Sequence, residues 1–181
     1  MVKKIIALGV ALVVGLGLFS GCKNDSVFTS EDFSLILEVN GAQVNAGDVI
    51  EANVGDIIEV KASLVNLSGR NAKFYFLIPE WWSDWKDYIG DYVIDDLGVY
   101  PRGVGVPSTA PPRTKFVKTR LKKGENLTRT INHQFVEILQ DSEGNPFSGI
   151  YSAGGSAKLY ANGKKAEPFT LSVTPITIKA I

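Results

Sequence analysis

Two near-copies of one heptapeptide, AGDVIEA at residues 46–52 and VGDIIEV at residues 54–60, decide the fold class of this chain. In each copy a Gly-Asp pair favours a tight turn, because Asp bonds to its own backbone and Gly tolerates unusual dihedral angles. The β-branched residues that follow favour a short strand. The eight-residue spacing is too short for a solenoid repeat. We therefore predict two successive turn-strand units, the second running on to Val65.

Alternating apolar and polar residues extend this pattern in both directions. Residues 33–39 alternate as a half-buried strand does, and Asn40-Gly41 favours a hairpin turn. Further strands are predicted at residues 72–78, 114–121, 127–139, 149–151, 157–160 and 169–181. About seven to nine short strands without a long amphipathic helix predict an all-β fold. We expect a single antiparallel sandwich domain that spans residues 33–181.

Two strands carry finer expectations. In residues 127–139 the apolar side chains lie on one face of the expected strand up to Phe135 and on the opposite face at Val136 and Ile138. This change of face predicts a bulge or a bend between sheets. Pro175 interrupts the last strand and has no backbone N–H to donate. It therefore predicts an edge position or a change of sheet.

The order of these elements resembles the immunoglobulin-like domains of bacterial surface lipoproteins. The resemblance rests on the glycine turns and long strand, on Gly149-Ile150-Tyr151, on the Asn162-Gly163 hairpin signal, and on the closing Pro175-Ile176-Thr177-Ile178. It covers about residues 33–78 and 114–181. It implies an immunoglobulin-like sandwich and implies no activity, since such sandwiches carry many functions.

The N-terminus determines the expected location. Lys3 and Lys4 precede an uncharged apolar run from residue 5 to residue 19, the pattern of a helical secretory signal peptide. The run is shorter than the roughly 20 residues of a spanning helix. The sequence Phe19-Ser20-Gly21-Cys22 resembles the lipobox of bacterial lipoproteins. That resemblance implies a signal peptide at 1–21, a lipid on the Cys22 thiol and a tether at 22–32. It places the protein at the cell membrane or the outer membrane, on the exported face.

Charge and residue counts exclude several function classes. The chain has 19 basic and 19 acidic residues, so it lacks the basic excess of a nucleic-acid-binding protein. It has one histidine, His133, and one cysteine, so a zinc site lacks its usual ligands. No nucleophile elbow or phosphate-binding loop is present. We expect a non-enzymatic protein with no catalytic residue, cofactor or metal.

Two triplets that match glycosylation acceptors, at Asn66 and Asn126, are interpreted as ordinary turn residues.

Residues 79–113 break the strand pattern and are predicted to be a long insertion. Residues 79–89 suit one or two helical turns, and a Gly- and Pro-rich stretch follows. The insertion is acidic, with Glu80, Asp84, Asp87, Asp91, Asp95 and Asp96. A solvated acidic face explains these residues best. A calcium site here or at Asp141, Glu143 and Asn145, and hydrolysis by paired carboxylates, are the alternatives.

The same insertion holds all three tryptophans of the chain. The candidate ligand-binding residues are Trp81, Trp82, Trp85, Tyr88 and Tyr92, and Tyr100 lies close by. They either form a small satellite core or a binding surface, since Trp and Tyr dominate binding hot spots. A membrane-interface role is disfavoured by the neighbouring carboxylates. We expect a lipid-anchored envelope protein that binds a protein or glycan partner. A carbohydrate-binding or carbohydrate-processing protein and an accessory or inhibitor lipoprotein are the alternatives.

Overall fold

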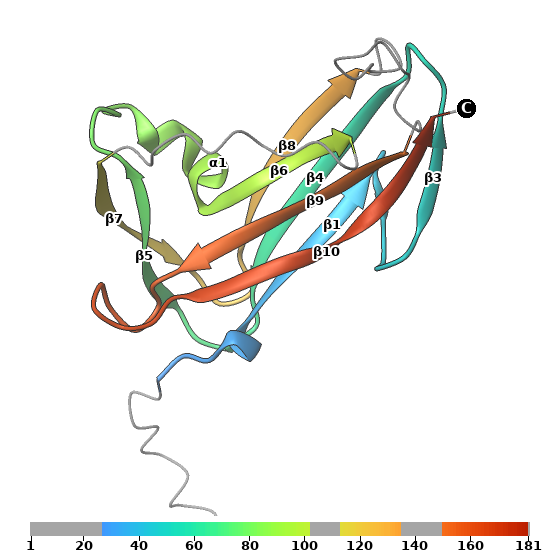
Figure 1. Ribbon diagram of the computed structural model, residues 1–181. Helices are drawn as coiled ribbons and strands as arrows, with labels where there is room; N and C mark the ends of the chain where they lie inside the picture. Colours follow the sequence, from blue (N-terminus) through green and yellow to red (C-terminus); the bar gives the residue numbers. More distant parts are fainter. Residues whose placement is uncertain (1–26, 102–112, 135–149, 181) are drawn as a thin grey trace, which may run out of the picture.

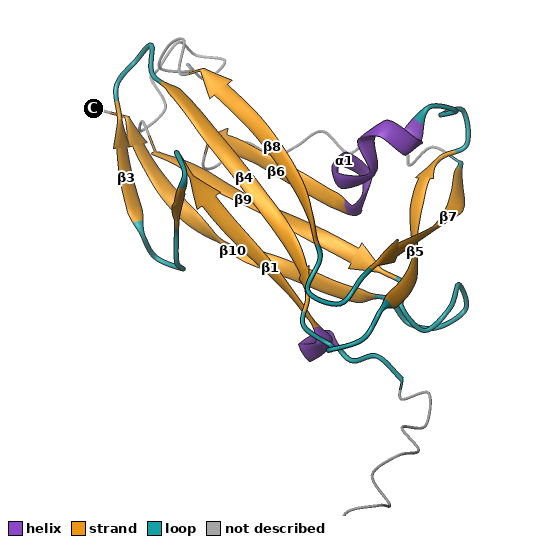
Figure 2. Cartoon of the chain, turned by 180° about the vertical axis from the view of Figure 1, so that it is seen from behind, coloured by secondary structure: helices purple, strands orange, loops and turns teal. Residues whose placement is uncertain are grey.

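The computed structural model describes residues 27–101, 113–134 and 150–180. Two four-stranded sheets face each other, and a two-stranded ribbon extends from one end (Figure 1; Figure 2 shows the reverse side). The elements, with η for a 3-10 helix, are η1 (Ser30–Asp32), β1 (Phe33–Val39), β2 (Ala42–Gln43), β3 (Val49–Ala52), β4 (Ile57–Asn66), β5 (Ala72–Pro79), η2 (Trp85–Tyr88), α1 (Ile89–Val93), β6 (Ile94–Pro101), β7 (Thr114–Leu121), β8 (Asn126–Gln134), β9 (Ile150–Leu159) and β10 (Phe169–Ala180).

The first sheet has the order β2-β1-β4-β8, and the second has the order β3-β10-β9-β6. β5 and β7 form the separate ribbon. Every strand pair is antiparallel except β3 with β10, which run parallel. The prediction of an all-β, mainly antiparallel fold is confirmed, and the parallel pair is the departure from it.

The two near-copies form the turns that their sequences predict. The Asp48 and Asp56 carboxylates accept hydrogen bonds from the backbone N–H groups of Asn45 and Asn53, each at 2.7 Å. The intervening glycines have positive φ angles. The strands that follow go to different sheets, β3 to the second and β4 to the first. The repeat therefore includes one of the points where the chain crosses from the second sheet to the first.

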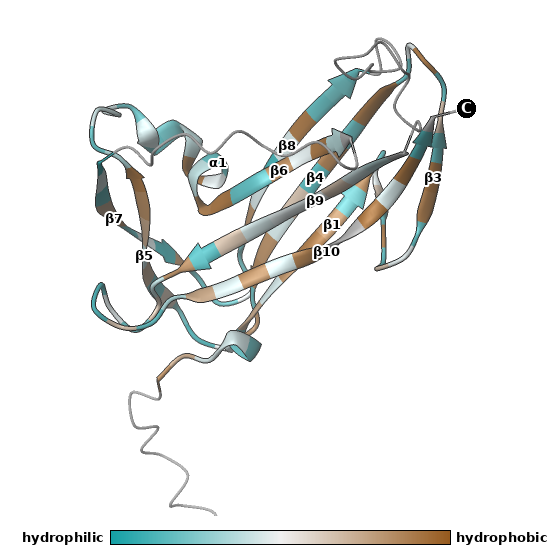
Figure 3. Ribbon diagram, viewed as in Figure 1, coloured by the Kyte–Doolittle hydropathy of each residue, from teal (hydrophilic) through white to brown (hydrophobic). Residues whose placement is uncertain are grey.

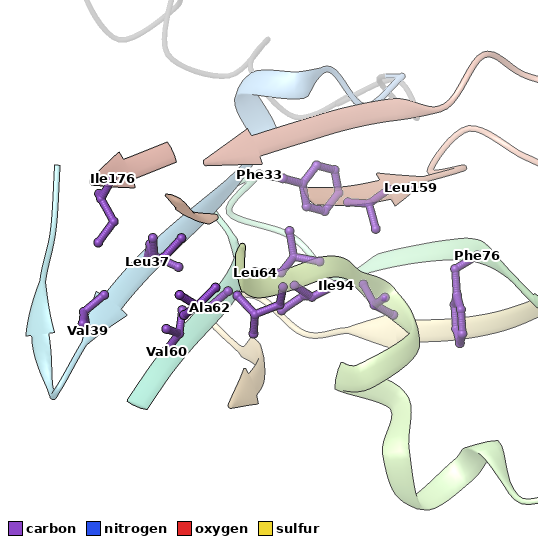
Figure 4. Close-up of a cluster of buried hydrophobic side chains, with 14 of the residues drawn as sticks. Phe33, Leu37, Val39, Val60, Ala62, Leu64, Phe76, Ile94, Leu159 and Ile176 are labelled. Carbon is purple, nitrogen blue, oxygen red and sulfur yellow. The ribbon is translucent and has the colours of Figure 1, made fainter. Parts of the chain in front are cut away.

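Apolar side chains from both sheets meet between them. β5 shows the expected alternation, with Phe74, Phe76 and Ile78 almost fully buried and their neighbours more exposed. Figure 3 shows the corresponding alternation of hydropathy along the strands, and Figure 4 shows part of the core. The largest fully buried side chains also include Leu37, Leu64, Ile94, Leu121, Leu159, Ile176 and Ile178. Burial of such side chains supplies the main driving force for folding.

Several strand predictions need correction. The strands expected at residues 149–151 and 157–160 are one continuous strand, β9. β10 stays in one sheet, so the change of sheet expected at Pro175 does not occur. β3 pairs only with Thr177–Ala180, so around Pro175 the described part of the chain pairs β10 with β9 alone, which agrees with the expected edge position. The register between β10 and β9 shifts between Val173 and Ile176, and a bulge accommodates the missing N–H. β8 pairs with β4 without a shift from Asn126 to Gln134. Phe135, Val136 and Ile138, which carried the predicted phase change, lie outside the described residues.

The end of the predicted tether lies against the domain. The Phe28 backbone exchanges two hydrogen bonds of 2.8 Å with the Asn162 side chain, and the Arg70 guanidinium lies 3.9 Å from the centre of the Phe28 ring. η1 follows directly and leads into β1. The predicted signal peptide at 1–21 and Cys22 lie outside the described residues. No helix in the described ranges has the length and apolar character needed to cross a membrane.

Candidate functional site

The predicted insertion is partly built into the fold. β5 and β7 pair along their whole length, from Ala72 with Leu121 to Pro79 with Thr114, so the intervening chain leaves from one end of the ribbon. Pro79 ends β5 and does not begin a helix, and the helical turns start only at Trp85. β6 then pairs with β9 as the edge strand of the second sheet. The insertion therefore contributes one strand, β6, to the second sheet, in addition to the helical turns η2 and α1.

The five candidate aromatic residues divide into two groups. Trp85 packs edge-on against Phe76 at a ring-centroid distance of 6.1 Å, and Trp85 and Tyr92 both lie against the hydrophobic core. Trp81 and Tyr88 are exposed, with 71% and 54% of their surfaces accessible. The packing of Trp85 and Tyr92 corresponds to the satellite-core alternative. Trp81 and Tyr88 are exposed, and a binding surface formed by them stays a prediction.

Three rings connect the buried part of the cluster to the exposed part. The Trp81 and Trp82 rings have centroids 5.1 Å apart, and the Trp82 and Tyr92 rings are also 5.1 Å apart. We call Trp81, Trp82 and Tyr92 the aromatic row. Tyr92 packs against the core at one end of the row. Trp81, at the other end, therefore packs on Trp82, which in turn packs on Tyr92. A tryptophan held in this way loses little conformational freedom when a partner binds it.

A lysine from β7 fixes the turn that carries the row. The Lys115 ammonium donates hydrogen bonds to the Trp82 backbone carbonyl at 3.0 Å and to the Glu80 carbonyl at 3.3 Å. The Glu80 N–H donates to the Arg113 carbonyl at 2.9 Å. Lys115 is not among the residues predicted for the site. Its role depends on the pairing of β5 with β7, and no local sequence pattern indicates it.

α1 is seated closely on β8. A Cβ atom on Gly90 would overlap the Thr128 backbone carbonyl, so only glycine allows this approach. Beside it, the Arg129 guanidinium donates a hydrogen bond of 2.7 Å to the Ile94 carbonyl. The same side chain lies 3.6 Å from the Asp91 carboxylate. These contacts determine where Tyr92, and therefore the aromatic row, sits relative to the first sheet.

The acidic residues of the insertion give the site a negative character. Burial, followed by the Asp95 carboxylate, raises the pKa of the Asp96 carboxyl, and Arg129 partly opposes this. Partial burial and the Asp91 carboxylate raise the pKa of the Tyr92 phenol. No three His, Cys, Asp or Glu side chains within the described ranges converge as metal ligands would. Asp141, Glu143 and Asn145 lie outside those ranges.

His133 is remote from this arrangement. It lies near the end of β8 and pairs with Ile58, whereas α1 contacts the same strand at Thr128. Burial lowers the pKa of its imidazole, which disfavours the charged form. The structure therefore does not bring the one histidine together with the carboxylates of the insertion.

Comparisons with known proteins do not identify a relative. No family model and no curated protein matches the chain. The chain is weakly similar to a β-glucosidase from Erythrobacter marinus, with 12% identity over 77% of this chain and 15% of that one and a TM-score of 0.28. A β-glucosidase from Listeria innocua shows 11% identity over 80% and 16%, with a TM-score of 0.26. The chain thus spans less than a fifth of each enzyme. Likenesses this weak carry no argument about fold or activity.

Proposed function

We propose that this chain is a lipid-anchored, non-enzymatic protein of the bacterial cell envelope whose immunoglobulin-like domain binds a partner through the exposed end of the aromatic row. The strand neighbours support the finer fold assignment. The orders β1-β4-β8 and β6-β9-β10 match the A-B-E and C-F-G neighbours of immunoglobulin domains. The ribbon of β5 and β7 is then an addition between the B and E strands.

The exposure of Trp81 carries the binding proposal. A tryptophan that keeps 71% of its surface in water forgoes the burial that an indole normally gains. Trp81 nevertheless packs on Trp82, and Lys115 holds the Trp82 carbonyl. A fixed, exposed aromatic ring is typical of binding hot spots in protein interfaces.

A glycan is the second candidate partner. The face of an indole ring suits the apolar face of a sugar, and carboxylates suit its hydroxyl groups. Glu80 and Asp84 are both exposed and flank Trp81 and Trp82 in the sequence. A protein partner and a glycan partner would use the same exposed surface, so one variant tests both.

Replacing Trp81 with alanine is expected to weaken partner binding at least about tenfold, because hot-spot truncations cost about 2 kcal/mol or more. Binding of the full chain to isolated envelopes and to a glycan array measures the effect. Protease treatment of the envelopes identifies a protein partner, and retention on the array identifies a glycan.

The matched control is Val49→Ala on β3, since Val49 is also an exposed apolar residue at 61% accessibility. It should leave binding unchanged. Equal binding by folded Trp81→Ala and Val49→Ala variants would count against the aromatic row. Trp85 is unsuitable for this test because its ring packs on Phe76, so its loss would change the fold as well as the surface.

The anchor has its own measurement. Mass spectrometry of protein purified from its own cells is expected to show a chain that begins at Cys22 and carries diacylglyceryl and acyl groups. Two acyl chains suffice for stable membrane anchoring, whereas one gives marginal binding. An unmodified chain that still begins at Met1 would remove the anchor from the proposal.

A further inference from the structure

One face of the β5–β7 ribbon is basic. Side chains alternate between the two faces of a strand, and the register pairs Lys73 with Arg120 and Tyr75 with Lys118. Lys73, Lys118 and Arg120 are therefore on one face, and all three are exposed. Together with Thr119 they line a shallow, open hollow.

The charges on this face are not balanced within the described part of the chain. No described carboxylate lies within ion-pair distance of Lys73, Lys118 or Arg120, and the ion pairs of Lys61 with Glu38 and of Arg129 with Asp91 lie on other strands. Like charges directly opposite on paired strands destabilise a sheet. An anion from outside the chain would relieve the repulsion between Lys73 and Arg120.

Aromatic rings lie beside the basic residues. The Phe116 ring packs edge-on against Tyr160 at 4.9 Å and against Tyr75 at 6.4 Å. The Lys164 ammonium lies 5.3 Å from the Tyr75 ring centre and 5.7 Å from that of Phe116. Tyrosine rings and the long stems of lysine favour the boundary between apolar lipid and water. The turn of residues 160–168 thus extends the basic face and adds Lys164.

The chain also enters the domain at this end. Asn162, in the same turn as Lys164, holds the Phe28 backbone through two hydrogen bonds. Cys22 precedes Phe28 by six residues, a span of at most about 21 Å. A lipid on Cys22 would keep the membrane surface within that distance of Phe28, which is bonded to the same turn that carries Lys164. The insertion with its carboxylates leaves from the other end of the ribbon, at Pro79 and Thr114 (Figure 1).

We propose that the basic face of the ribbon, formed by Lys73, Lys118, Arg120 and Lys164, docks on the anionic phospholipid headgroups of the membrane that holds the Cys22 anchor. This inference rests on the proposed anchor. Lysine and arginine near an anionic leaflet are attracted to it within about one Debye length. In this orientation the acidic insertion and the aromatic row lie at the end of the ribbon opposite the point where the anchored chain enters.

The test uses the protein purified from its own cells and reconstituted in vesicles of zwitterionic phosphatidylcholine, or of the same lipid with phosphatidylglycerol. An amine-acylating reagent followed by mass spectrometry reports the accessibility of each lysine. Labelling of Lys164 should be about fivefold lower on the anionic vesicles, as expected when one charge becomes engaged at the surface. Labelling of Lys179, which is exposed on β10, should not change, and high salt should restore the labelling of Lys164.

Two double variants give the matched comparison. Lys118→Gln with Arg120→Gln should abolish the protection of Lys164, and Lys86→Gln with Arg113→Gln, at exposed sites in and beside the insertion, should leave it intact. Equal labelling of Lys164 on both vesicle types would overturn the docking proposal. Flotation with neutral vesicles tests the anchor separately. A chain that does not float with them lacks the anchor, whatever its lysines show on anionic vesicles.

Discussion

Replacing Asn66 with alanine is expected to lower the free energy of unfolding by about 3 kcal/mol, because this buried side chain joins three segments of backbone. Asn66 is only 2% exposed. Its Nδ2 group donates to the carbonyl oxygens of Arg70, Leu121 and Lys122 at 2.8 to 3.1 Å. Its Oδ1 atom accepts from the Ser68 hydroxyl at 2.6 Å. Alanine would remove both the donors and the acceptor and would leave a cavity.

A second substitution separates the hydrogen bonds from packing. Asn66→Asp keeps the size and the acceptor but loses both donors. It also sets a carboxylate against three carbonyl oxygens, so it should destabilise at least as much as alanine. Asn71→Ala is the control, since exposed Asn71 accepts one bond of 3.1 Å from the Lys123 N–H and should cost about 1 kcal/mol or less. Urea unfolding at neutral pH measures all three variants. A wild-type midpoint for Asn66→Asp would show that the donors contribute nothing.

Gly90→Ala is expected to cost about 2 to 3 kcal/mol of stability and to displace α1, because overpacking against rigid backbone is poorly tolerated. The new methyl group would overlap the Thr128 carbonyl oxygen and lie 3.1 Å from its carbon. Relieving the overlap moves Ile89 to Val93 away from β8. That movement would separate Tyr92 from Trp82 and so disturb the aromatic row.

Urea unfolding and near-ultraviolet circular dichroism measure the two effects, the second through the altered contact of Trp82 with Tyr92. Gly155→Ala is the matched control. Its methyl group would meet the Leu97 Cδ1 atom at 3.2 Å, at the end of a side chain that can move, so the cost should be smaller. If Gly90→Ala retains the aromatic signal and the unfolding midpoint of the wild type, α1 is not held by this contact.

The parts of the fold that depend on local chemistry could be predicted from the sequence. The turns at Asp48 and Asp56 form because each carboxylate bonds to a backbone group three residues earlier, and this interaction is visible in the residues themselves. β6 was missed for a physical reason. Its register shifts between Asp95 and Gly98, and Asp96 has a positive φ of 51°, so the strand shows no regular alternation.

The sequence predicts which residue types gather in the candidate site, but it does not predict which of these side chains are buried and which are exposed. A cluster of Trp and Tyr in an irregular segment has no periodicity that separates inward from outward side chains. Trp85 and Trp81 therefore look equivalent in the sequence, although one packs on Phe76 and the other is exposed. Lys115 and Gly90 act on backbone carbonyls far away in the sequence, at Trp82 and Thr128. Such contacts become apparent only when the strand pairing is known.

The parallel pairing of β3 with β10 has a consequence for synthesis. β3, at Val49–Ala52, can pair in this sheet only after Thr177–Ala180 of β10 have been made, and β10 in turn lies between β3 and β9. Pairings between such remote segments form slowly. A ribosome must therefore synthesise β10 before the second sheet can close. Chains that stop before β10 would leave one edge of β3 and one edge of β9 unpaired, and proteases and chaperones can recognise such exposed edges.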